Sequence, residues 1–308
     1  MEATEDRPAA DYRAAELDGA LRGHGCRLTI LDSVPSTNEW LVEQLSRDAA
    51  HDAAGAPLRA VVAGFQSRGK GRLDRSWFTP AGTAVTFSVA LTPRDRSGRA
   101  WPQNLLPWLT LMLAHSVTAT VRELTGVPAA VKWPNDVLIR ERKVCGILAS
   151  LVPSPPGAAH QGPTVVLGAG INVQQCHLPV PGATSLRLET GNDAAVPTRS
   201  AVLTGVLAHF SRALDRASVD PAAQLGPGGE LRRELESALD TLGRRVLVHL
   251  PGRNAPLPAT AVGLGASGQL RVRDDDGREH EYGAGDVVHV RPGPRTPEDA
   301  GHENERPR

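Results

Sequence analysis

The chain has little cysteine and lacks any long apolar segment. Its three cysteines, Cys26, Cys145 and Cys176, are far apart and form no Cys-x-x-Cys pair. This spacing excludes a zinc knuckle and a disulfide framework, and it predicts reduced thiols. No apolar run approaches the roughly 20 residues that a membrane helix needs, and the acidic, polar N-terminal segment has no apolar signal core. We therefore expect a cytoplasmic protein without a membrane partner.

A net charge of one sign is also lacking. Lysine and arginine together number 34, aspartate and glutamate together number 34, and the formal net charge is +0. Such a chain has no overall basic field that would attract DNA, so no nucleic-acid partner is expected. Apolar residues make up 40% of the 308 residues, which is enough for a core. The length suits one large and one small domain, or two of middle size.

The pattern of apolar residues changes near residue 242, where we place a domain boundary. The tails 1–10 and 294–308 are polar and rich in proline or charge, and we expect both to be disordered. Within 11–242 the periodicity predicts strands at 27–31, 60–66, 83–91, 137–139, 144–151 and 164–172, and helices at 11–21, 37–45, 105–124, 199–217 and 230–242. Within 243–293, five short strands between glycine, proline and Asp-Gly turns predict a small barrel, at 245–250, 259–264, 269–273, 279–282 and 287–290.

A glycine-rich basic loop, residues 66–77, is the most informative segment. It follows an apolar strand and carries four cationic side chains within eight residues, interleaved with Gly69 and Gly71. Glycines let a backbone approach a ligand closely, and amides and cations together bind phosphate oxygens. The loop matches neither the P-loop pattern nor the dinucleotide-binding glycine pattern. Taken alone, it is equally compatible with a solvated basic loop.

A second cluster reads Lys132-Trp133-Pro134-Asn135-Asp136. Pro134 drives the backbone just before it to extended geometry. We therefore expect Lys132 to leave a strand end with its side chain in a fixed direction. A lysine at the edge of a pocket suits the stabilisation of charge on a carboxylate that is being adenylated. The alternative is a surface lysine at a hairpin. For two shorter segments, 142–148 with Lys143 at a hairpin tip and 168–172, ordinary strand packing is the favoured explanation when each is taken alone.

In this order and spacing, these segments together with Ser36-Thr37-Asn38 resemble the catalytic domain of biotin–protein ligases. The resemblance covers roughly residues 27–242, and Lys-Trp-Pro-Asn-Asp is its most specific motif. It implies an α+β fold: a mixed sheet with helices, similar to class II aminoacyl-tRNA synthetases, over 11–242, and an SH3-like small β-barrel over 243–293. It further implies the monofunctional type, without an N-terminal winged helix.

The resemblance also implies roles for particular residues. It assigns catalysis to Lys132 and Arg72. It assigns biotin binding to Ser36, Thr37, Asn38, Gln66, Gly69, Lys70, Gly71, Arg72, Lys132 and Gly146. It assigns ATP binding to Lys70, Arg72, Arg75, Trp77, Asn135, Lys143 and Asn172. The substrates implied are biotin and ATP with Mg²⁺, and no metal site formed by the protein is expected.

The implied reaction has two steps, formation of biotinyl-5′-AMP from biotin and ATP, then transfer of biotin to a lysine of a carrier protein. Positioning and charge stabilisation suffice for both steps, which fits the absence of a recognisable Ser/His/Asp triad. One departure concerns the loop. Where the family often has Gly-Arg-Gly-Arg-Arg-Gly-Arg, this chain has Gly-Lys-Gly-Arg-Leu-Asp-Arg at 69–75, so Lys70 keeps the charge without bidentate geometry.

The implied partner is the biotin carboxyl carrier domain of acyl-CoA carboxylases, and the expected assembly is a monomer or a weak homodimer. Two other functions compete with this one. A biotin-responsive DNA-binding repressor is disfavoured because only about 26 residues precede the first expected strand, and this segment is acidic rather than basic. A lipoate or octanoate ligase or transferase is disfavoured by the Lys-Trp-Pro-Asn-Asp motif and by the C-terminal strands.

Overall fold

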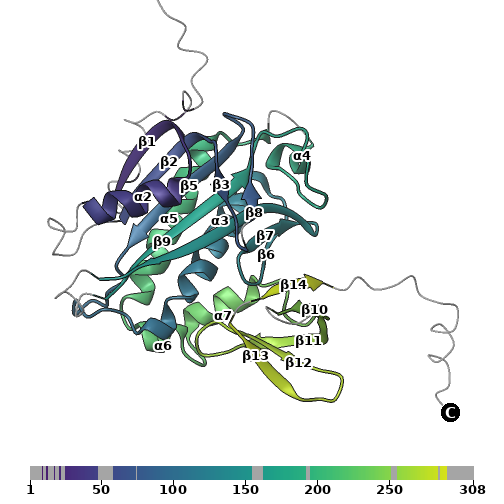
Figure 1. The fold of residues 1–308 in the computed structure, drawn as a ribbon. Helices are drawn as coiled ribbons and strands as arrows, with labels where there is room; N and C mark the ends of the chain where they lie inside the picture. The colour runs from purple at the N-terminus through teal and green to yellow at the C-terminus, as the bar shows by residue number, and fades with distance from the viewer. Residues whose placement is uncertain are drawn as a thin grey trace, which may run out of the picture.

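The protein consists of a large mixed α/β unit and a smaller antiparallel sheet, seen in a computed structural model (Figure 1). The structure describes residues 25–47, 58–73, 75–154, 162–191, 195–250, 255–283 and 285–289, together with positions 9, 12, 17 and 21. The expected disordered tails and the expected helix at 11–21 lie almost wholly outside the described residues. Among the described helices, none is both long and apolar enough to cross a membrane.

The large sheet has seven strands and carries the pocket described below. In spatial order they are β1 (Cys26–Val34), β2 (Leu58–Gln66), β5 (Ala84–Leu91), β9 (Thr164–Asn172), β8 (Arg142–Val152), β7 (Asp136–Ile139) and β6 (Ala129–Lys132). Only the β1–β2 pair is parallel, so the sheet is mixed and mostly antiparallel. Each strand expected from the sequence is confirmed within a few residues.

Helices cover both faces of this sheet. On one face lie α3 (Trp108–Thr125) and α5 (Arg199–Ala217), which pack against each other and form most of the main core. On the other face, α2 (Thr37–Arg47) packs over β2, β5 and β9. Neighbouring residues of β2 point to opposite faces of the sheet. Val62 belongs to the main core, and Val61 belongs to the small cluster that includes Leu41 of α2. Two short helices, α4 (Leu186–Thr190) and α6 (Pro221–Leu225), were not expected from the sequence.

The helix expected at 230–242 is shorter than predicted. In the structure α7 spans Glu230–Ser237. The chain then leaves the helix to pair with β6, where Val131 N donates to the carbonyl of Ala238 and Asp240 N donates to the carbonyl of Val131. These backbone bonds replace the last helical turn. They bring the segment after α7 beside the strand that ends at Lys132.

The second sheet is antiparallel throughout. Its spatial order is β13 (Glu279–Tyr282), β12 (Leu270–Arg273), β11 (Leu257–Leu264), β10 (Arg245–His249) and β14 (Asp286–His289). Side chains of the large unit hold it by donating to its backbone carbonyls. Trp108 Nε1 lies 3.0 Å from the carbonyl of Ala266, and Trp133 Nε1 lies 3.0 Å from that of Gly268. The five strands expected from the sequence are therefore confirmed as one sheet docked on the large unit.

Two partly buried histidines predict that stability falls in acid. Burial lowers the pKa of His115 and of His289 below their ordinary value of 6.5. The unfolded chain therefore binds protons near pH 6.5 that the folded chain does not, so the free energy of unfolding should decrease as the pH falls below that value. Urea denaturation at several pH values between about 8 and 5 measures this. His289→Gln should make the decrease shallower, and an unchanged pH dependence in that variant would contradict the assignment.

Candidate active site

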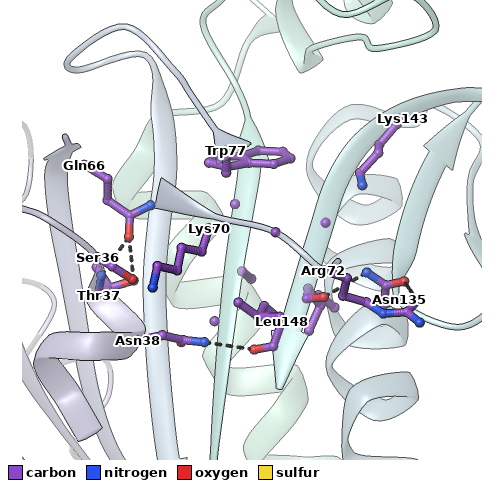
Figure 2. Close-up of a pocket in the computed structure, with 16 residues that line it drawn as sticks. Ser36, Thr37, Asn38, Gln66, Lys70, Arg72, Trp77, Asn135, Lys143 and Leu148 are labelled. Carbon is purple, nitrogen blue, oxygen red and sulfur yellow. Dashed lines mark hydrogen bonds between the residues drawn. The ribbon is translucent and has the colours of Figure 1, made fainter. Parts of the chain in front are cut away.

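A pocket opens beside the N-terminus of α2, over β8 and β9, under a short hairpin of β3 (Gly69–Lys70) and β4 (Ser76–Trp77) (Figure 2). The hairpin is formed by the glycine-rich basic loop. Four chain segments, 36–38, 66–77, 135–148 and 168–170, thus meet at one cavity. The lining residues are Ser36, Thr37, Asn38, Gln66, Lys70, Gly71, Arg72, Trp77, Asn135, Lys143, Gly146, Ile147, Leu148, Gly168, Ala169 and Gly170.

One end of the pocket is neutral and polar. The backbone amide and the hydroxyl of Thr37 both donate to Gln66 Oε1, at 2.7 and 3.0 Å. Asn38 Nδ2 donates to the carbonyl of Leu148 at 3.1 Å, which joins α2 to β8 (Figure 2). These side chains are buried and their orientations are fixed by hydrogen bonds within the protein. A ligand here would meet prepositioned neutral donors and acceptors, with Lys70 as the cation beside them (Figure 2).

Ser88 on β5 hydrogen-bonds the side chains at this end of the pocket, and its role was not predicted from the sequence. Its hydroxyl lies 2.8 Å from Thr37 Oγ1 and 2.6 Å from Asn38 Oδ1, and its side chain is fully buried. The alternation in 83–91 places Thr86 and Ser88 on a polar strand face, which was the available signal. A polar face that is buried rather than solvated has to be hydrogen-bonded. Here those bonds hold the pocket.

The other end of the pocket is cationic. Arg72 and Lys143 lie at this end (Figure 2), and no carboxylate is among the residues that line the pocket. Arg72 donates from Nη1 to Asn135 Oδ1 at 2.8 Å and from Nη2 to the carbonyl of Gly285 at 3.2 Å. Lys143 Nζ lies 2.6 Å from Asp136 Oδ1 and 5.9 Å from the ring centroid of Trp77. Lys70 lies instead beside the N-terminus of α2 (Figure 2), where it forms an exposed ion pair with Glu39, a carboxylate outside the lining. This end is suited to an anionic ligand group.

Glycines on β8 and β9 leave the space that the pocket uses. A Cβ atom at Gly168 would lie 2.3 Å from Asn38 Oδ1, and one at Gly170 would lie 2.3 Å from Trp77 Cε2. Any larger residue would therefore displace one of these side chains. The expectation at 168–172 singled out this segment without assigning Gly168 or Gly170 to the site. Ile147 and Leu148 were also missed, because nothing in an apolar strand distinguishes a pocket wall from core.

Four residues expected in the site do not line this pocket, namely Gly69, Arg75, Lys132 and Asn172. Gly69 pairs with Trp77 in the hairpin, and the carbonyl of Arg75 accepts from Gly71 N. Asn172 is buried, with its Nδ2 donating to the carbonyl of Thr184 at 2.9 Å. Lys132 ends β6 opposite Asp136, the partner of Lys143.

The described residues contain no metal cluster, and two of the three thiols, Cys26 and Cys145, are buried. No three His, Cys, Asp or Glu side chains gather in the described part of the chain so that they could hold a metal ion. All three cysteines are free, as expected. Burial raises the pKa of Cys26 to about 12, and burial also raises the pKa of Cys145, next to Gly146, well above its ordinary 9.0. A thiol that stays protonated is a poor nucleophile.

Comparison with known proteins supplies the family. The model of the biotin/lipoate A/B protein ligase family matches residues 31–172. A biotin–[acetyl-CoA-carboxylase] ligase of Mycobacterium tuberculosis is 34% identical over 292 residues, which are 92% of this chain and 97% of that relative. A bifunctional ligase/repressor of Escherichia coli is 31% identical over 166 residues, but these are only 46% of its length.

A solved structure agrees with the sequence comparison. The biotin protein ligase of Aquifex aeolicus, in complex with biotin and ATP, has a TM-score of 0.64 and 28% identity. The similarity covers 86% of this chain and 99% of that one. Both the large mixed sheet and the C-terminal antiparallel sheet therefore have a counterpart in a known architecture.

Proposed function

Because the chain belongs to the biotin–[acetyl-CoA-carboxylase] ligase family, we propose that it uses ATP to activate biotin and joins it to one lysine of a biotin carboxyl carrier domain. The observation that carries this proposal is the division of one pocket into a neutral polar end and a cationic end. Biotin has an uncharged ureido ring at one end and a carboxylate at the other, so the two ends match. We place the reaction in the cytoplasm, where ATP and carboxylases are available.

The finer description of the fold belongs to the same proposal. We assign residues 11–242 to a catalytic domain of the type found in class II aminoacyl-tRNA synthetases, and 243–293 to an SH3-like domain. The mixed, mostly antiparallel sheet with helices on both faces supports the first assignment. A five-stranded antiparallel sheet of short strands supports the second.

We assign the neutral end to the biotin ring. Ser36, Thr37, Asn38 and Gln66 are proposed to bind the ureido group and its surroundings. A bicyclic urea needs neutral donors and acceptors at the end of a slot, and a mismatched ligand would leave buried polar groups without partners. Gly69, Gly71 and Gly146 complete the proposed biotin site through their backbones. Ser36 also lies at the start of α2, where its hydroxyl is 3.5 Å from Glu39 N, so a helix-capping role coexists with binding.

We assign the cationic end to the reacting carboxylate and the phosphates. Lys70, Arg72 and Arg75 on the loop, with Lys143 and Asn135, are proposed to hold the triphosphate. Trp77 and Asn172 are also proposed to bind the ATP nucleotide. Lys132 is proposed to neutralise charge at the biotin carboxylate and the oxygen that bridges to phosphorus. Magnesium is proposed to enter as part of the MgATP substrate, held by phosphate oxygens and water.

The chemistry follows from these assignments. A biotin carboxylate oxygen attacks the α-phosphorus, pyrophosphate leaves, and biotinyl-5′-AMP forms. A deprotonated carrier lysine amine then attacks the carbonyl carbon of this mixed anhydride, AMP leaves, and an amide bond forms. The protein contributes orientation and fixed positive charge, which cost no reorganisation during the reaction. Closure of the hairpin over the pocket would shield the anhydride from water.

The half-reactions separate this function from its competitor. With labelled pyrophosphate and MgATP, biotin should support exchange of label into ATP, whereas lipoate and octanoate should support little. A chain that exchanges with lipoate and not with biotin would be a lipoate ligase instead. The family model covers both activities, so this comparison of substrates decides between them.

The glycine at position 168 gives a test of the biotin end. Gly168→Ala should force Asn38 away from its bond to Leu148, and the affinity for biotin should fall about tenfold or more, the equivalent of one lost hydrogen bond to a buried group. Isothermal titration with biotin measures this effect. Gly263→Ala on β11, where a Cβ meets nothing within 4 Å, is the matched control. Unchanged affinity in a folded Gly168→Ala protein would contradict the placement of biotin.

A further inference from the structure

The edge strand of the second sheet, β14, lies near β6 of the large sheet (Figure 1). It pairs with β10 on one side only. Two separate contacts run from this strand and the residue before it toward the proposed catalytic cations. They involve chain segments more than one hundred residues away in sequence.

The first contact holds Arg72. Its guanidinium donates two hydrogen bonds, from Nη1 to Asn135 Oδ1 at 2.8 Å and from Nη2 to the carbonyl of Gly285 at 3.2 Å. Gly285 is buried and directly precedes β14. A guanidinium with two acceptors in fixed directions loses most of its freedom to rotate. The loop cation is therefore oriented by the second sheet as well as by the pocket wall.

The second contact holds the segment that carries Lys132. Thr241 Oγ1 accepts from the backbone amide of Trp133 at 3.0 Å, and the same oxygen lies 3.1 Å from His289 Nε2 on β14. The Thr241 proton is donated to the imidazole when Nε2 is the unprotonated ring nitrogen. His289 Nδ1 lies 3.7 Å from Asp240 Oδ2. This chain of contacts joins β14 to the peptide next to Lys132.

We propose that β14 braces the cationic end of the pocket, and that Thr241 and His289 are positioning residues for Lys132 while the Gly285 carbonyl positions Arg72. This inference rests on the proposed function, since it assumes that both cations act on the phosphates. The second sheet then contributes to catalysis without touching a substrate. A displacement of about 1 Å at a charged group costs up to about a hundredfold in rate, so removing the brace should lower turnover.

The charges around His289 agree with a neutral imidazole in this brace. Lys132 on β6, Asp240 after α7, Arg244 before β10 and Glu141 in the β7–β8 turn surround it. Burial, and then the positive charge of Lys132, lower the pKa of His289. A neutral ring accepts the Thr241 proton, whereas a protonated ring would add a cation beside Lys132.

The test compares variants of the full chain in biotin-dependent pyrophosphate exchange. Thr241→Val removes the hydroxyl with little change of shape, and Thr241→Ser keeps it. We expect Thr241→Val and His289→Leu to lower kcat about tenfold or more and to leave the KM for biotin within about twofold. Thr241→Ser should restore most of the rate. The biotin KM should be spared because the neutral end of the pocket lies on other elements.

The control is Trp108→Phe, which removes another hydrogen bond between the two units, from Nε1 to the carbonyl of Ala266. It should lower the melting temperature without a matching loss of kcat. The brace is overturned if Thr241→Val and His289→Leu keep the wild-type kcat, or if their kcat falls only in proportion to stability, as with Trp108→Phe. Should Thr241→Val fail to fold, His289→Leu decides. A wild-type chain without any exchange would instead overturn the proposed function.

Discussion

Lys132→Ala is expected to slow formation of biotinyl-5′-AMP by about a hundredfold or more, the loss seen when one electrostatic stabiliser is removed. The physical reason is that a carboxylate attacking a phosphate brings two anions together, and a fixed ammonium at the bridging oxygen offsets that repulsion. Single-turnover measurement with labelled ATP gives the rate directly. The effect should appear in kcat rather than in the KM for biotin.

Lys132 lies outside the residues that line the pocket, so a large loss of rate in this variant would be direct evidence that it acts on the reacting groups. Lys132 is only partly buried at a strand end, so the variant should keep its fold. Arg245→Ala is a suitable control, since it removes a cation that pairs with Asp275 in the second sheet. A folded Lys132→Ala protein with near-normal adenylation would show that this lysine is not the charge stabiliser.

Arg72→Gly is expected to release biotinyl-5′-AMP about ten- to a hundredfold faster, the range for one lost charge-assisted hydrogen bond. Arg72 contributes a cation to the pocket and ties the hairpin to Asn135 and Gly285. Without it, the loop loses both a ligand contact and its anchor. Rapid filtration or fluorescence chase of bound adenylate measures the release rate.

Released adenylate should also label lysines indiscriminately. The chain itself has only three lysines, Lys70, Lys132 and Lys143, so labelling is best followed on a lysine-rich bystander protein. The wild-type protein should label a carrier domain and leave the bystander almost unlabelled, whereas Arg72→Gly should label both. Arg59→Gly, on β2 and away from the pocket lining, serves as a control. Tight retention of adenylate by Arg72→Gly would refute the role given to this side chain.

The sequence predicted most of the fold because its elements carry strong periodic signals. The strand at 83–91 and the helix at 199–217 correspond to β5 and α5 within one residue at each end. The errors occur where tertiary contacts override local pattern. The segment after α7 was expected to stay helical, but pairing with Val131 pulled it onto β6. No local pattern in 238–242 signals a strand partner one hundred residues earlier.

The candidate site was predicted less completely than the fold. Charged and motif residues such as Arg72 and Asn135 were recognisable and do line the pocket. Ser88 and Gly168 were missed, because a buried hydroxyl or a strand glycine gains its role only from what packs above it. The contact of Arg72 with Gly285 joins residues more than two hundred positions apart. Sequence periodicity contains no information about such a pair.

The most direct test of the central claim is intact-mass analysis of a biotin carboxyl carrier domain after incubation with this protein, biotin and MgATP. The carrier should gain the mass of one biotinyl group, on a single lysine that peptide mapping identifies. A carrier with arginine at that position should gain none. An unmodified carrier in the presence of all three components, or modification by lipoate in place of biotin, would contradict the proposed function.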